Sequence, residues 1–318
     1  MGKSAQKKTS ALLSRIYYQR CVLMQTLYKK IISIIAEGSP SVKIVIQIVF
    51  LGGGIDTSLE ELLSTIQGDF ANIQFKVFVL DFESVLARRD IIQNPQVEVK
   101  HISADLRVWQ VAHSKLETNG FNFKSTARKE KSEDNIFTLI VEECVFCYID
   151  EKSVDCILRN LAHDSLPETV FLGYSPLLSP QRKDTKSSFF ASTMLEGFAA
   201  NGASILSGDD SLIDREKRFL RSGWAQVISM DIQSSWSATI PIHERSIPPA
   251  EDPFDEFASL AVINRHYAIT IASLSLDLFR SVLSNIFERK DNSILSRKLQ
   301  ETVSSSVTSS DKYFLFHA

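Results

Sequence analysis

Apolar residues in the first part of the chain follow two different spacings. Between residues 9 and 36 they recur at every third or fourth position, and Gly38 follows. This spacing predicts one long amphipathic helix with a glycine stop. Residues 44–51 are apolar except for Gln47, which predicts a strand. The sequence therefore predicts a helix with one buried face, followed by the first strand of a sheet.

Strands and helices then alternate along the chain. We expect further strands at residues 75–80, 97–102, 136–141 and 168–173, separated by helices at 57–66, 84–92, 108–119 and 151–162. After helices at 189–199 and 214–221, two more strands at 224–230 and 267–271, separated by a helix at 254–264, would close the sheet as an added hairpin. This alternation predicts an α/β fold with a doubly wound, mainly parallel, seven-stranded sheet.

Composition narrows the class of protein. A chain of 318 residues with 44% hydrophobic content buries a substantial core, and a net charge of -3 argues against gripping nucleic acid through bulk charge. The longest apolar run is shorter than the roughly 20 residues of a membrane span. Four irregularly spaced cysteines without a signal peptide favour a reducing compartment. We therefore expect a cytoplasmic, monomeric protein that binds neither membrane nor nucleic acid.

Chemically suggestive residues stand where four predicted strands end. The first strand is followed by Gly52, Gly53 and Gly54, and the second ends on Asp81. Asp105 and Glu143 follow the third and fourth strands. In a doubly wound sheet, ligands bind beyond the carboxyl ends of the strands. Glycines there let a ligand approach the backbone, so the pattern indicates a nucleotide-like ligand.

The glycine pattern separates two ligand classes that the spacing of the acidic residue leaves open. Asp81 lies 29 residues after Gly52, which suits hydrogen bonds to ribose hydroxyls in dinucleotide enzymes and in S-adenosylmethionine methyltransferases alike. Thr57 stands where the dinucleotide fingerprint G-x-G-x-x-G has its third glycine, and this disfavours a pyrophosphate ligand. A methionine-containing nucleoside needs instead a cation for its carboxylate, which Arg20 could supply.

Purely structural interpretations stay open at most of these positions. The glycines could form a simple turn, Asp81 and Asp105 could cap helices, and Arg20 could be a solvated helix charge. Glu143 favours a function, because an unpaired carboxylate after an apolar strand is costly. Cys144 and Cys147 form a C-x-x-C without a second pair, so packing is favoured over zinc, and the histidines have no metal spacing.

Seven segments occur in a fixed order between residues 15 and 273. They are Y-Y-Q-R at 17–20, G-G-G-I-D-T at 52–57, D-F at 81–82 with R-R at 88–89, A-D-L-R at 104–107, L-I-V-E-E-C-V-F-C-Y at 139–148, F-L-R-S-G-W at 219–224, and D-E at 255–256 with R-H-Y at 265–267. In this order they resemble motifs of the leucine carboxyl methyltransferase family, such as G-A-G-M-D-T, A-D-L-R and L-L-I-A-E-C-V-L-V-Y. Each motif is weak alone, but seven in order are specific.

The resemblance implies a class I S-adenosylmethionine-dependent methyltransferase fold, with S-adenosylmethionine as the cofactor. It also implies a methyltransferase domain at residues 38–290, an N-terminal helix at 1–37 packing on that core, and a flexible tail at 291–318. The cofactor-binding residues carried over onto this sequence are Arg20, Gly52, Gly53, Gly54, Asp81, Asp105, Leu106 and Glu143.

The resemblance also assigns a role to each position. Arg20 would pair with the methionine carboxylate, Asp81 would hold the ribose, and Glu143 would face the amino group. Asp105 and Leu106 would flank the adenine, and the glycine turn would touch the cofactor through its backbone. No residue is expected to act as a catalytic base, because a carboxylate acceptor is already ionised at neutral pH.

The family methylates the C-terminal leucine carboxylate of type 2A protein phosphatase catalytic subunits, which implies that substrate here. The family has an N-terminal segment with a cofactor-binding lysine and helices over the active site, for which we expect no counterpart among these residues. A related tRNA wybutosine methyltransferase carries a propeller domain for which we expect too little length. The alternatives are a non-catalytic interaction protein with this fold and a small-molecule O-methyltransferase.

Overall fold

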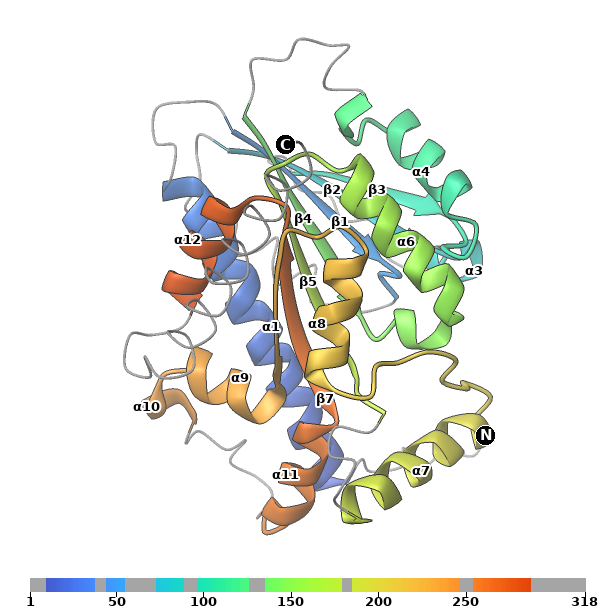
Figure 1. Ribbon diagram of the computed structural model, residues 1–318, viewed down its shortest axis with the longest axis vertical. Helices are drawn as coiled ribbons and strands as arrows, with labels where there is room; N and C mark the ends of the chain where they lie inside the picture. The colour runs from blue at the N-terminus through green and yellow to red at the C-terminus, as the bar shows by residue number, and fades with distance from the viewer. Residues whose placement is uncertain are drawn as a thin grey trace, which may run out of the picture.

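Figure 1 shows the computed structural model of the chain, whose centre is a seven-stranded sheet in the order β3-β2-β1-β4-β5-β7-β6. The structure describes residues 10–37, 44–54, 73–88, 97–125, 135–178, 185–245 and 254–286. The predicted helix at 57–66 and the predicted tail at 291–318 lie outside these ranges. The doubly wound fold class is confirmed by the strand order.

Five strands of the sheet are parallel. They are β1 (Ile44–Leu51), β2 (Ile73–Asp81), β3 (Val97–Ser103), β4 (Asn135–Glu143) and β5 (Thr169–Pro176). The last strand, β7 (Tyr267–Ser273), enters antiparallel between β5 and β6 (Gln226–Asp231). Chain order reverses where β1 meets β4, which is the point at which ligands bind in such sheets.

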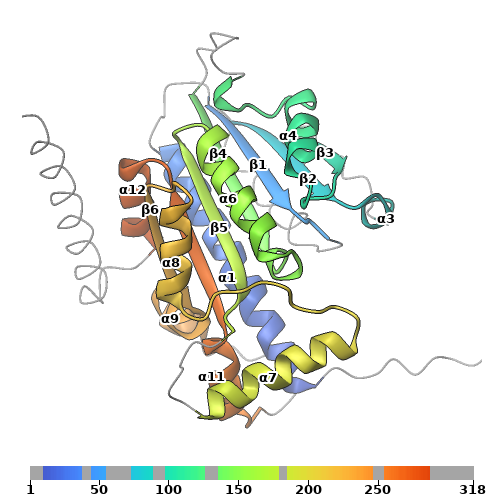
Figure 2. The same ribbon diagram turned by 45° about the vertical axis from the view of Figure 1, so that its right-hand side comes forward.

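Helices cover both faces of this sheet (Figures 1 and 2). One core cluster joins the sheet to α1 (Ala11–Glu37), α9 (Ile232–Thr239) and α12 (Leu276–Ile286). The other cluster joins it to α4 (Trp109–Thr118), α6 (Glu151–Asp164) and α8 (Leu212–Arg221). The sheet is therefore the middle of three layers.

Shorter helices and one further long helix surround this frame. These are α3 (Glu83–Leu86), η1 (Phe146–Tyr148), α7 (Thr185–Ala200), α10 (Ile242–Arg245) and α11 (Phe257–Arg265). In Figure 2, α7, α11 and the first half of α1 lie together at the carboxyl end of the parallel strands. These elements therefore border the end of the sheet where a ligand would bind.

The one polar residue in β1 explains how this strand can be central. All eight residues of β1 are buried, including Gln47. The amide of Gln47 donates to Thr138 Oγ1 and to the carbonyl of Asn122, both at 2.8 Å, and its oxygen accepts from the Asn122 N–H at 2.9 Å. Because its side chain has partners, Gln47 avoids the cost of an unpaired buried amide.

The long N-terminal helix agrees with its sequence pattern. Leu23, Leu27, Ile31 and Ile35, each four residues apart, are all buried on one face of α1. That face packs on the sheet and on α12. Lys30 reaches across to donate to the carbonyl of Ile286 at 3.1 Å.

Candidate functional site

The glycine turn after β1 is tied to the neighbouring strand. The N–H groups of Gly52 and Gly53 both donate to the carbonyl of Leu80, at 2.8 and 3.1 Å. Gly52 and Gly54 have φ angles of 75° and 56°, a left-handed conformation that favours glycine. The backbone donors of Gly52 and Gly53 are thus used within the protein, and the turn offers a ligand its side-chain-free surface.

Asp81 is held in place by the same turn. Its Oδ2 accepts the Gly54 N–H and its Oδ1 accepts the Phe82 N–H, both at 2.7 Å. A carboxylate oxygen can accept more than one hydrogen bond. The side chain is therefore fixed beside the glycine turn and keeps acceptor capacity for the hydroxyls of a ligand.

Arg20 on α1 meets Glu143 at the end of β4. Arg20 Nε donates to Glu143 Oε2 at 3.0 Å, and Nη2 lies 2.9 Å from the same oxygen. The other oxygen, Oε1, accepts the hydroxyl of Tyr28, which lies two helical turns further along α1. The side chains of Arg20 and Glu143 are 22% and 12% exposed, so the pair is reached by solvent on one side only.

Two stacked tyrosine rings pack against the arginine of this ion pair. The guanidinium carbon of Arg20 lies 5.1 Å from the centre of the Tyr174 ring, and Tyr174 stacks on Tyr267 at 5.4 Å. Burial opposes the charge of Arg20, but the carboxylate of Glu143 and its other neighbours raise its pKa further above the ordinary value. Arg20 is therefore a permanent cation at this site.

A cavity of about 390 Å³ lies at the carboxyl ends of β1 and β4. The charged pair Arg20 and Glu143 stands against the three glycines of the turn, and apolar side chains complete the wall. The lining residues are Arg20, Phe50, Leu51, Gly52, Gly53, Gly54, Val141 and Glu143. The structure thus brings together five of the residues predicted from the sequence, with Asp81 bonded to the edge of the turn.

The other two predicted residues do not line this cavity. The carboxylate of Asp105 is bonded to the guanidinium of Arg107 at 2.7 to 3.0 Å, which together with a backbone bond lowers its pKa. Leu106 is buried in the core cluster that contains α4. Their segment is nevertheless adjacent, because the Ala104 N–H donates to the carbonyl of Asp81 at 2.9 Å.

Sequence reasoning missed two side chains that support this site. Tyr28 bonds Glu143, and Val145 packs so closely on the glycine turn that a Cβ on Gly52 would lie 2.5 Å from its methyl group. The signal for Tyr28 was present, since residues eight apart lie on the same face of a helix. Val145 had no signal, because its position depends on the turn after β4.

The C-x-x-C pair consists of two free thiols. Burial raises the pKa of Cys144 to about 12 and raises that of Cys147 as well. Within the described ranges, no group of three or more His, Cys, Asp or Glu side chains could hold a metal ion. None of the helices in these ranges combines the length and apolarity that a membrane span requires.

The sheet order and the placement of the site define the class. A seven-stranded sheet with β7 antiparallel between β5 and β6, and a glycine turn and an acidic residue at the ends of β1 and β2, is the class I methyltransferase fold. No protein-family model matches the sequence.

Comparison with characterised proteins places the chain more narrowly. It is 24% identical over 279 residues to a leucine carboxyl methyltransferase 1 homologue of Arabidopsis thaliana, which covers 83% of this chain and 78% of that protein. It is 24% identical over 245 residues to leucine carboxyl methyltransferase 1 of Yarrowia lipolytica, covering 72% and 70% of the two chains. The chain is a distant homologue of the leucine carboxyl methyltransferases.

A second group of relatives is longer. The match to tRNA wybutosine-synthesizing protein 4 of Aspergillus fumigatus is 25% identical over 284 residues and covers 84% of this chain but 26% of that protein. The chain therefore spans about a quarter of the length of these relatives.

Solved structures are more remote. A putative methyltransferase from Thermobifida fusca superposes with a TM-score of 0.45 at 12% identity, over 79% of each chain. Human N-acetylserotonin methyltransferase in complex with S-adenosylmethionine gives a TM-score of 0.39 at 12% identity, over 71% of this chain and 47% of that chain. The fold assignment rests on the strand order of the chain itself.

Proposed function

We propose that this chain is an S-adenosylmethionine-dependent methyltransferase that methylates the carboxylate of a C-terminal leucine on a type 2A protein phosphatase catalytic subunit. The observation that carries the proposal is the Arg20–Glu143 pair beside the glycine turn, in a cavity of about 390 Å³. The homology to leucine carboxyl methyltransferases supports the choice of substrate class.

The charges at the cavity match an amino acid. Arg20 is a cation with five N–H donors in a planar fork, which suits a carboxylate. Glu143 next to it is an anion, which suits an ammonium group. An amino acid bearing both groups, such as the methionine part of S-adenosylmethionine, would therefore find complementary partners on α1 and at the end of β4.

The nucleoside part would lie toward β2. Asp81 is fixed at the edge of the turn and would accept hydrogen bonds from ribose hydroxyls. Gly53 and Gly54 carry no side chain, so that the sugar can lie close to the end of β1, whereas the space beside Gly52 is filled by Val145. Asp105 would approach the adenine, which requires its bond to Arg107 to open or to be shared.

The reaction requires alignment and not proton abstraction. S-adenosylmethionine supplies a methyl group on a positively charged sulfur, and a carboxylate at pH 7 is already an anion able to attack it. Burial raises the pKa of Tyr148 to about 12 and also raises that of Tyr267. These tyrosines are therefore neutral at pH 7.

The exposed surface at this end of the sheet suits an apolar C-terminal residue. Tyr17 on α1, Phe189 on α7 and Phe257 on α11 are 54%, 73% and 64% exposed. Their helices lie together at the carboxyl end of the strands (Figure 2). Exposed aromatic side chains are typical of surfaces that bind another protein.

Transfer of a tritiated methyl group tests the acceptor. The chain would be incubated with labelled S-adenosylmethionine and one of three acceptors: the intact phosphatase catalytic subunit, the same subunit without its last leucine, or tRNA that carries an unmethylated wybutosine precursor. We expect label on the intact subunit alone. Equal label on both protein forms would refute the C-terminal leucine, and label on tRNA alone would favour the function named by the longer relatives.

A further inference from the structure

Glu142, the residue before Glu143, is a carboxylate with no place in the site described so far. Successive side chains of a strand point to opposite faces of the sheet, so Glu142 faces α6 and α8 while Glu143 faces α1. It is 1% exposed. Its Oε1 accepts the N–H groups of Val145 and Phe146, at 2.6 and 3.0 Å.

These two bonds close the turn that follows β4. Within the turn Cys144 has a φ of 55°, a left-handed conformation that a residue with a side chain adopts only when its surroundings hold it. The Cys144 N–H donates to the carbonyl of Tyr174 at 2.7 Å, which fixes the turn to β5. The bonds to Glu142 and to Tyr174 therefore set the direction in which the chain leaves Glu143.

The turn also reaches the glycine turn of the cofactor cavity. The Val145 N–H donates one of the two hydrogen bonds that Glu142 accepts. The methyl groups of Val145 lie 2.5 and 2.8 Å from the position that a Cβ on Gly52 would take. Val145 thus fills the space that the absent side chain of Gly52 leaves. Two contacts, that of Glu142 with Val145 and that of Val145 with Gly52, therefore join Glu142 to the wall of the cavity.

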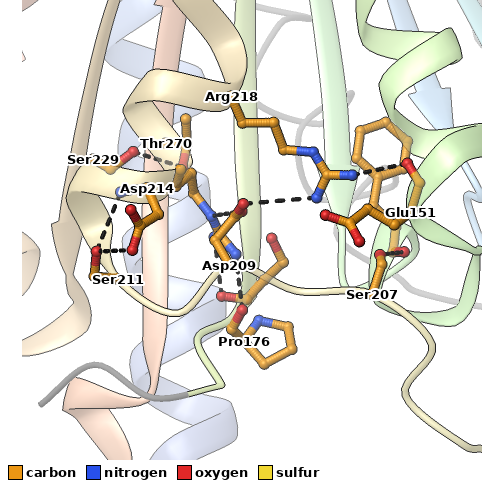
Figure 3. Close-up of polar contacts among 12 residues, drawn as sticks. Glu151, Pro176, Ser207, Asp209, Ser211, Asp214, Arg218, Ser229 and Thr270 are labelled. Atoms are coloured by element: carbon orange, nitrogen blue, oxygen red, sulfur yellow. Dashed lines mark hydrogen bonds and ion pairs between the residues drawn. The ribbon is translucent and has the colours of Figure 1, made fainter. Parts of the chain in front are cut away.

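A buried ionic cluster stands on the other side of Glu142. Arg215 is 4% exposed and bonds Asp209 Oδ2 at 3.0 Å and the carbonyl of Pro176 at 2.8 Å. Arg218 lies beside the same aspartate, with Nη1 3.6 Å from Oδ1 (Figure 3). Glu142, Asp209, Arg215 and Arg218 all line one cavity of about 410 Å³.

Groups on this side of the sheet also hold the turn that follows β4. Burial raises the pKa of Glu142, while the two backbone N–H groups and the charge of Arg215 counteract part of this rise. Ser207 Oγ donates to the carbonyl of Phe146 at 2.7 Å (Figure 3). The turn is therefore held by Glu142 at its N–H groups and by Ser207 at a carbonyl.

We propose that Glu142 is a positioning residue for the candidate cofactor site: its two hydrogen bonds hold the turn that directs Glu143 toward Arg20 and presses Val145 against Gly52. Glu142 does not line the cavity that Arg20 and Glu143 share, so it acts through these neighbours. The inference rests on the proposed function, because the site it arranges is the proposed S-adenosylmethionine site.

Three variants separate this role from a general contribution to stability. Glu142→Gln keeps an oxygen that can accept the two N–H groups, Glu142→Ala removes it, and Val145→Ala removes only the contact with Gly52. Asp150→Ala is the matched control, since Asp150 also accepts a backbone N–H, that of Ser153, at the start of α6. Each variant is measured by titration calorimetry with S-adenosylmethionine, by hydrogen exchange of residues 144–148, and by thermal unfolding.

We expect Glu142→Ala to speed exchange at residues 145 and 146 and to weaken cofactor affinity about tenfold or more, which corresponds to 1.4 kcal/mol. Glu142→Gln should stay within about threefold of wild type and Asp150→Ala should leave the affinity unchanged. Val145→Ala should weaken affinity without loss of exchange protection at residue 146. A folded Glu142→Ala protein with wild-type affinity overturns the proposal.

Two outcomes distinguish this inference from the proposed function. If the wild-type chain does not bind S-adenosylmethionine, the proposed function fails, and the positioning role in a cofactor site fails with it. If wild type binds and Glu142→Ala does not fold, Val145→Ala decides the matter: unchanged affinity in that variant overturns the positioning role and leaves the proposed function intact.

Discussion

Arg20 and Glu143 lie 123 residues apart in the sequence, yet Nη2 of the arginine is 2.9 Å from the glutamate carboxylate. The contact joins the first helix to the central strand β4, across the layer boundary of the fold. Because Glu143 also accepts the hydroxyl of Tyr28 on the same helix, α1 is locked to the sheet where the candidate cofactor cavity opens.

Replacing Arg20 by Gln should weaken binding of S-adenosylmethionine at least about tenfold, because a neutral amide replaces a cation facing the methionine carboxylate. Titration calorimetry measures this directly. Lys29→Gln is the matched control, since Lys29 is an exposed cation on the same helix. Equal affinities in wild type and Arg20→Gln would remove Arg20 from the site.

Replacing Gly52 by Ala should destabilise the fold for two reasons. The left-handed backbone costs a residue with a Cβ about 1–2 kcal/mol, and the new Cβ would lie 2.5 Å from Val145. Gly202→Ala is the control for the cost of the left-handed backbone, because Gly202 has a φ of 74° and open space around it. The difference between the two variants in chemical denaturation therefore reports the clash.

The double variant Gly52→Ala with Val145→Ala should recover part of this loss, because it removes the two methyl groups that the new Cβ meets. The expected sign is a double-variant loss smaller than the sum of the two single losses. Strict additivity would show that Val145 does not press on the turn.

Asp81→Ala should weaken cofactor affinity at least about tenfold, because the ribose loses an acceptor and the Gly54 N–H loses its partner. Asp81→Asn keeps one neutral acceptor and should fall between. Asp231→Ala provides a comparison, since Asp231 also ends a strand and accepts a backbone N–H, that of Ser234. An unchanged dissociation constant in Asp81→Ala would place the ribose elsewhere.

The two thiols of the C-x-x-C pair should be slow to alkylate. With the pKa of Cys144 raised to about 12 by burial, about one molecule in ten thousand holds its thiolate at pH 8, against about a quarter for an ordinary thiol. Raising the pH should speed alkylation tenfold per unit until well above pH 10. Peptide mass spectrometry after timed iodoacetamide exposure measures each cysteine.

In that experiment the exposed Cys21 should be labelled first. Unfolding the chain in guanidinium should make all four cysteines react alike, which serves as the control. Labelling of Cys144 in the folded protein as fast as that of Cys21 would show that the surroundings of Cys144 do not disfavour its thiolate.

The frame of the fold could be predicted because its signals are local. Strand β1 was predicted with the bounds that the structure shows, and α1 begins two residues later and ends one residue later than predicted. The prediction left out α9 and α12 and the short helices α10 and η1. In α12 the signal was present, since Leu278, Phe279, Val282, Leu283 and Ile286 are all buried at helical spacing. The short α9 gave a weaker signal, because four of its eight residues are Ser or Thr.

The site was predictable only in part, for a physical reason. Strand-end residues such as Asp81 and Glu143 follow from the rule that ligands bind beyond the carboxyl ends of parallel strands. The bond between Asp105 and Arg107 and the closeness of Val145 to Gly52 depend on turn conformations, which sequence periodicity does not encode. The roles of the cofactor residues stay predictions until binding is measured.

The contact of Lys30 with the last carbonyl of α12 has a consequence for biosynthesis. Arg20 emerges early from the ribosome, but the hydrophobic surface that seats its helix includes Leu278, Val282 and Ile286. The nascent chain cannot complete the α1 layer until nearly 290 residues have been translated. A ribosome-bound fragment ending before α12 should therefore expose the apolar face of α1 and attract chaperones.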